Sequence, residues 1–224
     1  ISSEGVPVFY ARVDHVSVPL AQEGTGQVVV DFTPEPLTQD VSFVFHIEKT
    51  ADVVVDSLTA EISGIPSTME LTTGLILAQK TYKLLFRPTY AALPSAADSA
   101  SAETLRCEAS VNIPGIVRSH TEDMVTGPGI LQIAIYTHYD YEEEGTQRKA
   151  AKVFHAGINL YHTLKERKSL QWDEEENGYR QASRSITVEI GSPLNIDKDG
   201  ILNGGSTSTG LDQWIPGETF EIEV

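Results

Sequence analysis

The side chains best suited to chemistry are histidines and acidic residues that gather in a few short segments. His138, His155 and His162 fall on two neighbouring predicted strands, where a metal site is one interpretation. They alternate with polar residues and have no carboxylate at ligand spacing, so a polar strand face is the favoured interpretation. The acidic runs at residues 142–144 and 173–176 could mimic the paired carboxylates of a glycosidase. Both runs lie in hydrophilic turn segments, where we expect solvated faces and no catalytic residues.

A second candidate site is the segment that begins at Asn195. Asn195, Asp197 and Asp199 place oxygen ligands at alternate positions and Gly200 is sixth, as in a calcium-binding EF-hand loop. The twelfth position is Ser206 instead of glutamate, and no helices flank the loop. The alternative is an Asp-Gly turn at a loop tip, because both residue types tolerate positive φ. The favoured interpretation is the turn, without a metal.

Aromatic residues in the second half of the chain offer a third kind of site. A planar array of them could stack against sugar rings, as in a carbohydrate-binding module of a surface glycan-binding lipoprotein. The alternative is that they belong to the core and rim of a β-sandwich. The residues concerned are Trp172, Trp214, Tyr139, Tyr141, Tyr161 and Tyr179.

Other signatures of catalysis are missing from the sequence. It contains no GxSxG, HExxH, GxxxxGK[ST] or CxxC motif. The only cysteine, Cys107, shares a strand face with Leu105 and Val111, which predicts a buried structural thiol. We therefore predict that the protein is not an enzyme and needs no cofactor.

Composition limits the partners. The chain has 224 residues, with 16 basic and 32 acidic side chains, so its formal net charge is −16. This charge repels nucleic acid and anionic membrane surfaces. No apolar segment approaches the roughly 18 residues of a membrane-spanning helix. We predict a protein that binds no nucleic acid and does not span a membrane.

The elements that must position these residues are strands. Residues 41–47 alternate between apolar and polar side chains, and residues 54–62 repeat the pattern after a short polar break. The two runs predict a hairpin whose apolar faces build the centre of the core, with Val54 on the buried face. Further strands are predicted at residues 27–32, 81–88, 105–113, 130–139, 152–163, 185–190 and 220–224.

No apolar stripe of helical period appears along the chain, so the sequence predicts an all-β protein, an antiparallel β-sandwich. The strand at residues 130–139 is apolar on both faces, which predicts a place near a sheet centre. Residues 164–176 can hold a short helical turn. The Ala/Ser-rich residues 91–102 predict a mobile surface loop.

The segment HIEK…VDSLTAEISGIPSTMELTTG resembles the fimbrillin-like proteins of Bacteroidetes, the type V pilus subunits and their associated lipoproteins. The motif is SGxxxxxxLxTG, carried here by Ser63-Gly64 and by residues 71–74. The resemblance implies a transthyretin-like sandwich over residues 19–224, preceded by an extended linker or first strand at residues 1–18. The start at Ile1, without Met or signal peptide, predicts the C-terminal part of a longer precursor with a lipid anchor.

The resemblance also implies a function. It predicts a structural and adhesive component of a cell-surface fimbrium, on the extracellular side of the outer membrane. Its partners would be other pilus subunits, joined by β-strand addition, and surface ligands of host or bacterial cells. The terminal run Phe220, Ile222 and Val224 has the alternation that a donated strand requires. The alternative is an ordinary strand of its own sheet.

Overall fold

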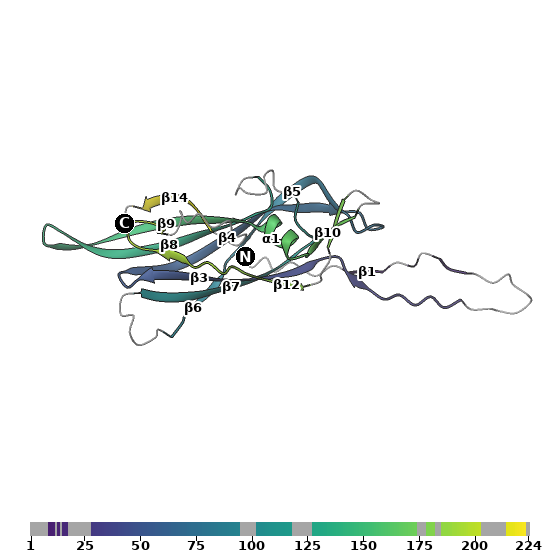
Figure 1. Ribbon diagram of the computed structural model, residues 1–224, viewed down its shortest axis with the longest axis horizontal. Helices are drawn as coiled ribbons and strands as arrows, with labels where there is room; N and C mark the ends of the chain where they lie inside the picture. The colour runs from purple at the N-terminus through teal and green to yellow at the C-terminus, as the bar shows by residue number, and fades with distance from the viewer. Residues whose placement is uncertain are drawn as a thin grey trace, which may run out of the picture.

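A computed structural model of the chain describes residues 9–11, 13, 15–17, 28–94, 102–117, 127–173, 178–181, 185–202 and 214–222. These residues form a β-sandwich with one short helix at its end and a narrow arm that extends away from it (Figure 1). The all-β class predicted from the sequence is confirmed. The predicted mobile loop falls largely on residues 95–101, which lie outside the described residues.

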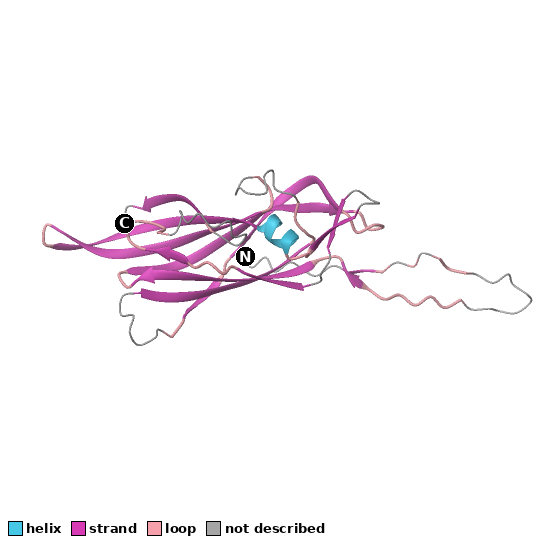
Figure 2. Ribbon diagram, viewed as in Figure 1, coloured by secondary structure: helices cyan, strands magenta, loops and turns pink. Residues whose placement is uncertain are grey.

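Two five-stranded sheets make the two layers (Figure 2). In the first sheet the order is β12 (Ser185–Glu189), β3 (Gln39–Thr50), β7 (Ala102–Ile113) and β6 (Thr89–Ala92), and β13 (Leu194–Ile196) also pairs with β3. In the second sheet the order is β14 (Ile215–Ile222), β9 (Thr146–Asn159), β8 (Ile130–Glu143), β4 (Val53–Met69) and β5 (Ile76–Phe86). All of these pairs are antiparallel except β12 and β13, which run parallel to β3.

The core lies between the facing sides of the two sheets. Along β3 the residues Val41, Phe43, Phe45 and Ile47 are at most 1 % exposed, as their alternation predicted. Across the core, the ring of Phe43 stacks on Phe86 of the opposite sheet at a centroid distance of 5.9 Å. The strand predicted at residues 130–139 is confirmed as central, because β8 lies between β9 and β4.

The predicted hairpin between residues 41–47 and 54–62 is wrong. β3 and β4 are joined by the two-residue turn at residues 51–52, yet β3 pairs with β7 and β12 while β4 pairs with β5 and β8. The chain therefore crosses from one sheet to the other at this corner. The apolar faces of both strands line the core, one in each sheet, so their alternation is satisfied without a shared ladder.

Val54 was also assigned to the wrong face. Its side chain is 44 % exposed, whereas Val53 and Val55 are buried. The register of β4 against β8 shifts between Val55 and Ser57, so an extra residue at Asp56 reverses the alternation before Leu58. Tyr90 of the opposite sheet donates its hydroxyl to the carbonyl oxygens of Val55 and Asp56, at 3.0 and 3.1 Å.

The helix α1 (Leu160–Glu166) closes one end of the sandwich directly after β9. Asn159 caps it, with its side-chain oxygen accepting from the backbone N–H of His162 at 3.0 Å. Leu160, Tyr161 and Leu164 are buried beneath it. The helix begins four residues before the predicted segment at 164–176, so the strand predicted at 152–163 is wrong over its last four residues. The Asn159 cap ends the strand and starts the helix at this point. A short strand pair follows, β10 (Leu170–Asp173) with β11 (Gly178–Gln181).

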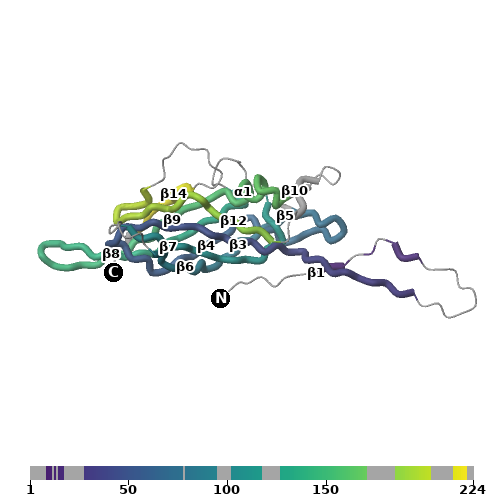
Figure 3. The backbone as a smooth tube through the Cα atoms, turned by 60° about the horizontal axis from the view of Figure 1, so that its bottom comes forward, coloured from purple at the N-terminus to yellow at the C-terminus, as the bar shows by residue number. Residues whose placement is uncertain are grey.

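The arm is built from the N-terminal segment. β1 (Phe9–Tyr10) pairs with β2 (Glu35–Pro36), and the flanking residues continue outward from the sandwich (Figures 1 and 3). The strand predicted at residues 27–32 is wrong, because residues 28–34 have no ladder and Phe32 is 60 % exposed. Two chain segments without a second layer cannot bury an apolar face. Among the described residues, no helix is long and apolar enough to cross a membrane.

Candidate functional site

The C-terminal strand β14 and the surface beside it form the candidate site. Among the described residues, β14 is an edge strand of the second sheet and pairs with β9 alone, where Phe220 lies opposite Val153 and Ile222 opposite Ala151. This internal pairing is the arrangement expected for an ordinary strand of the sheet. The side chain of Ile222 and the whole of Val224 lie outside the described residues.

The described side chains of β14, at residues 215–220, anchor the strand weakly. The register against β9 shifts between Pro216 and Thr219, and proline supplies no N–H to the ladder. Ile215 is 45 % and Phe220 is 51 % exposed, so neither side chain enters the core. The buried residue in this segment is Trp214, just before the strand, whose ring meets Phe45 edge-on at 5.4 Å.

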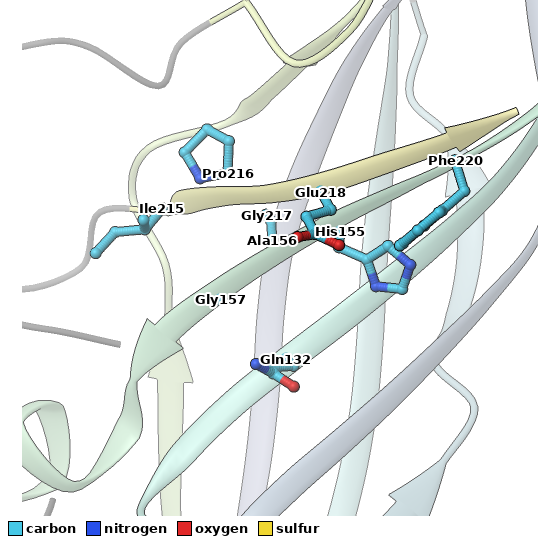
Figure 4. Close-up of a pocket in the computed structure, with 9 residues that line it drawn as sticks. All are labelled: Gln132, His155, Ala156, Gly157, Ile215, Pro216, Gly217, Glu218 and Phe220. Carbon is cyan, nitrogen blue, oxygen red and sulfur yellow. The ribbon is translucent and has the colours of Figure 1, made fainter. Parts of the chain in front are cut away.

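The irregular part of β14 opens a hollow of about 300 Å³ on the outer face of the sheet (Figure 4). Gly157 on β9 is itself buried, but its ladder partners Gln132 and Ile215 are exposed on the outer face, and without a side chain it leaves the centre of the hollow open. Gln132 on β8 stands on one side and Ile215 on β14 on the other, each opposite Gly157 in the ladders. The hollow is therefore created by a missing side chain and a bulge.

Two rings form one wall of this hollow. His155 and Phe220 meet edge to face, with their centroids 5.6 Å apart and their planes perpendicular. Gly217 approaches His155 so closely that a Cβ there would lie 3.0 Å from the His155 Cβ. Glu218 completes the rim. The site combines an exposed aromatic ring with an amide, an imidazole and a carboxylate.

The loop that resembles an EF-hand uses its own carboxylate internally. Asp197 Oδ1 accepts from the backbone N–H groups of Asp199 and Gly200, at 2.7 and 2.9 Å. Asn195 accepts from Leu202 through its backbone carbonyl at 2.7 Å. These bonds form an Asx turn at Asp197, in which neither Asp199 nor Gly200 has the positive φ expected from the sequence. Ser206 lies outside the described residues.

The histidines named from the sequence do not converge. His138 on β8 bonds through Nδ1 to Asp56 at 2.8 Å, His155 belongs to the hollow, and His162 lies in α1. The described residues contain no group of three or more His, Cys, Asp or Glu side chains placed to hold a metal. Of the acidic runs, residues 142–144 are exposed at the tip between β8 and β9, and residues 174–177 lie outside the described part.

The predicted aromatic array is divided between the core and the surface. Trp214 and Tyr161 are buried, at 3 % and 0 % exposure. Tyr139 and Tyr141 contact each other on β8 with centroids 6.2 Å apart. The side chains of Trp172 and Tyr179 lie outside the described residues. The buried pair removes two members from any exposed sugar-stacking platform.

The motif that carried the family resemblance has a structural role. The φ of Gly64 is +76°, and a Cβ there would lie 2.4 Å from the backbone nitrogen of Gly129. Ser63 Oγ accepts from the N–H of Ile130 at 3.2 Å, which ties the same two segments together. At the other end, Thr72 and Thr73 donate to the Glu70 carboxylate in the turn between β4 and β5. The motif fixes backbone geometry at two places.

Cys107 is buried in β7, as predicted, opposite Phe45. Burial raises the pKa of its thiol to about 12, so the reactive thiolate is scarce near neutral pH.

Sequence reasoning missed the hollow. Its residues come from β8, β9 and β14, and Gly157 carries no chemical signature of its own. One local signal was present, the Pro216-Gly217 pair that interrupts the final alternating strand, which is typical of a bulge.

Comparison with known proteins gave no match to a family model, to a curated protein or to a solved structure.

Proposed function

We propose that this protein is a structural and adhesive component of a cell-surface pilus, a fimbrillin-like subunit or accessory protein, that assembles by β-strand addition. The observation that supports this proposal is the weak side-chain anchoring of β14 at the edge of the second sheet. Ile215 and Phe220 are about half exposed, and the ladder with β9 is interrupted at Pro216.

Strand addition requires an edge whose occupant can be replaced at little cost. A donated strand would recover the backbone hydrogen bonds that β14 makes with β9, so those bonds favour neither strand. The difference in binding free energy between the two strands then depends on the side chains that leave the core. The half-exposed residues of β14 lose little buried apolar surface when the strand is released, and Trp214 is the main anchor. β9 would become the acceptor edge.

The partners in this proposal are other pilus subunits and ligands on host or bacterial surfaces. The proposed location is the extracellular side of the outer membrane. The net charge of −16 suits a soluble external domain that does not bind polyanions.

The test is a disulfide that locks β14 in place. Phe220 and Val153 are direct neighbours across the ladder, so cysteines at both positions can bridge the strands. A fluorescent peptide with the sequence of residues 214–222 is added, and its incorporation is followed by fluorescence anisotropy. We expect the parent to take up the peptide slowly, the oxidised variant to exclude it, and a reductant to restore uptake.

A matched control places the two cysteines at Ser42 and Ser110, which face each other in the ladder between β3 and β7 of the first sheet and whose hydroxyl oxygens lie 3.2 Å apart. This variant should take up the peptide as the parent does. Failure of the parent to incorporate the peptide would refute strand exchange at this edge. So would equal uptake by the Phe220–Val153 variant in its oxidised form.

A further inference from the structure

We infer that the hollow beside β14 binds one sugar ring of a neutral glycan, with Phe220 as the stacking surface and Gln132 and His155 as hydrogen-bonding groups. This inference is independent of strand exchange, because it concerns the outer face of the sheet with β14 in place.

The size of the hollow limits its ligand. A hollow of about 300 Å³ lies at the lower end of the range for ligand sites, so it accommodates one ring better than an extended chain. Its centre is Gly157, which has no side chain, and its walls rise on β8 and β14 (Figure 4). The opening faces solvent, so a ring bound there can belong to a longer glycan that continues outside.

Phe220 supplies an exposed apolar surface in the hollow. Phe220 is 51 % exposed although it is a large aromatic side chain. The perpendicular contact with His155 restrains the Phe220 ring, so little side-chain freedom remains to be lost on binding. The C–H face of a sugar ring is apolar and covers such a surface, while its hydroxyl groups stay available to polar neighbours.

Gln132 and His155 supply polar groups to the hollow. Gln132 offers an amide with two donors and one acceptor oxygen, and His155 offers one donor and one acceptor in its neutral form. Within the described part of the chain, neither side chain makes a hydrogen bond. Hydroxyl groups of a sugar both donate and accept, so they match this mixed set.

The charge near the hollow restricts the ligand class further. Glu218 lies on the rim, and the whole chain carries a net charge of −16. Of the described residues that line the hollow, none is a lysine or arginine. A sugar acid or a phosphorylated ligand would meet repulsion without a compensating cation. The ligand class is therefore a neutral sugar.

The experiment is a titration of the 15N-labelled full chain with neutral sugars, followed by NMR. The probes are glucose, galactose, mannose and N-acetylglucosamine as free sugars and as β1–4-linked trimers, with glucuronic acid and sialic acid for comparison. We expect at least one neutral probe at millimolar concentration to shift the amide signals of Gly157, Gly217 and Phe220. The two acidic probes should leave them unchanged.

Three variants identify the site. Phe220→Ala and Gln132→Ala should each weaken binding by about tenfold, a change that is readily measured. Gly157→Leu fills the hollow and leaves every polar group in place, so it should abolish binding. Leu85→Ala is the matched control, because Leu85 is 63 % exposed on β5 of the same sheet, outside the hollow.

The inference is overturned if no neutral probe shifts these amides, if an acidic probe binds better, or if Gly157→Leu binds as tightly as the parent. The oxidised Phe220→Cys/Val153→Cys variant separates the two proposals. It lacks the aromatic ring but keeps β14 fixed, and it should bind sugar as weakly as Phe220→Ala. If the parent binds no sugar yet still incorporates the peptide, only the sugar site is refuted.

Discussion

Replacing Phe45 with alanine tests the arrangement of the core most directly. Phe45 is 1 % exposed on β3, and its ring meets Trp214 edge-on at 5.4 Å. Truncating a buried Phe costs roughly 3–5 kcal/mol through lost transfer energy and the cavity left behind. About 0.5–1.5 kcal/mol of this belongs to the aromatic pair. The loss is a large share of a typical domain stability of about 5–15 kcal/mol.

The assay is urea denaturation followed by circular dichroism and tryptophan fluorescence. In a thermal scan, the same loss of stability would lower the Tm of a chain of this size by roughly 6–20 °C. Because Trp214 leads into β14, we also expect faster amide hydrogen exchange in β14 of the Phe45→Ala variant. Phe32→Ala is the matched control, since the same change is made at a residue that is 60 % exposed on the arm.

The control should change stability by less than about 0.5 kcal/mol. Similar urea midpoints for Phe45→Ala and Phe32→Ala, with unchanged slopes, would show that β3 does not face the core in the way described.

Three further predictions use other parts of the molecule. Gly64→Ala should destabilise the protein by roughly 3 kcal/mol or more, because the new Cβ would lie 2.4 Å from the backbone nitrogen of Gly129. Gly145→Ala is the control: Gly145 has the same φ of +76° with nothing within 4 Å, so the change should cost only about 1–2 kcal/mol. Equal urea midpoints for the two variants would contradict the clash. Cys107 should resist a thiol reagent in the native protein at pH 8, where a pKa of about 12 leaves about one thiolate in 10⁴; labelling should become rapid only in urea or as the pH rises towards 12. Asp197→Ala should lower stability by about 1 kcal/mol by removing the acceptor of two N–H groups, and Ca²⁺ should not raise the Tm of the parent, which a calorimetric scan with and without the ion can check.

The buried face of β3 was predictable from the sequence, but its neighbours in the sheet were not. Alternation at Val41, Phe43 and Phe45 reports which side chains avoid water, and all three are buried. It carries no information on which strand donates the hydrogen bonds. The short turn at residues 51–52 suggested a hairpin, while two opposed apolar faces were better satisfied by a crossing between sheets.

The candidate site was predictable only in part. Alternation in the last residues predicted a strand at Phe220, and that strand is present at a sheet edge. The hollow depends on the absence of a side chain at Gly157 and on a register shift near Pro216. Neither has a periodic signal, because a bulge is defined by the partner strand as much as by its own residues. The reversal at Asp56 escaped prediction for the same reason.

The pairing of β3 has a consequence for how the protein is made. Its partners are β7, which ends at Ile113, and β12 and β13, which end at Glu189 and Ile196, so the last of them is synthesised 146 residues after β3 ends at Thr50. At about 5–20 residues per second this delay is about 7–30 s. β7 is complete after the first 63 of those residues, and until then the apolar residues 41–47 have no strand beside them. The second edge of β3 stays unpaired until β12 and β13 follow.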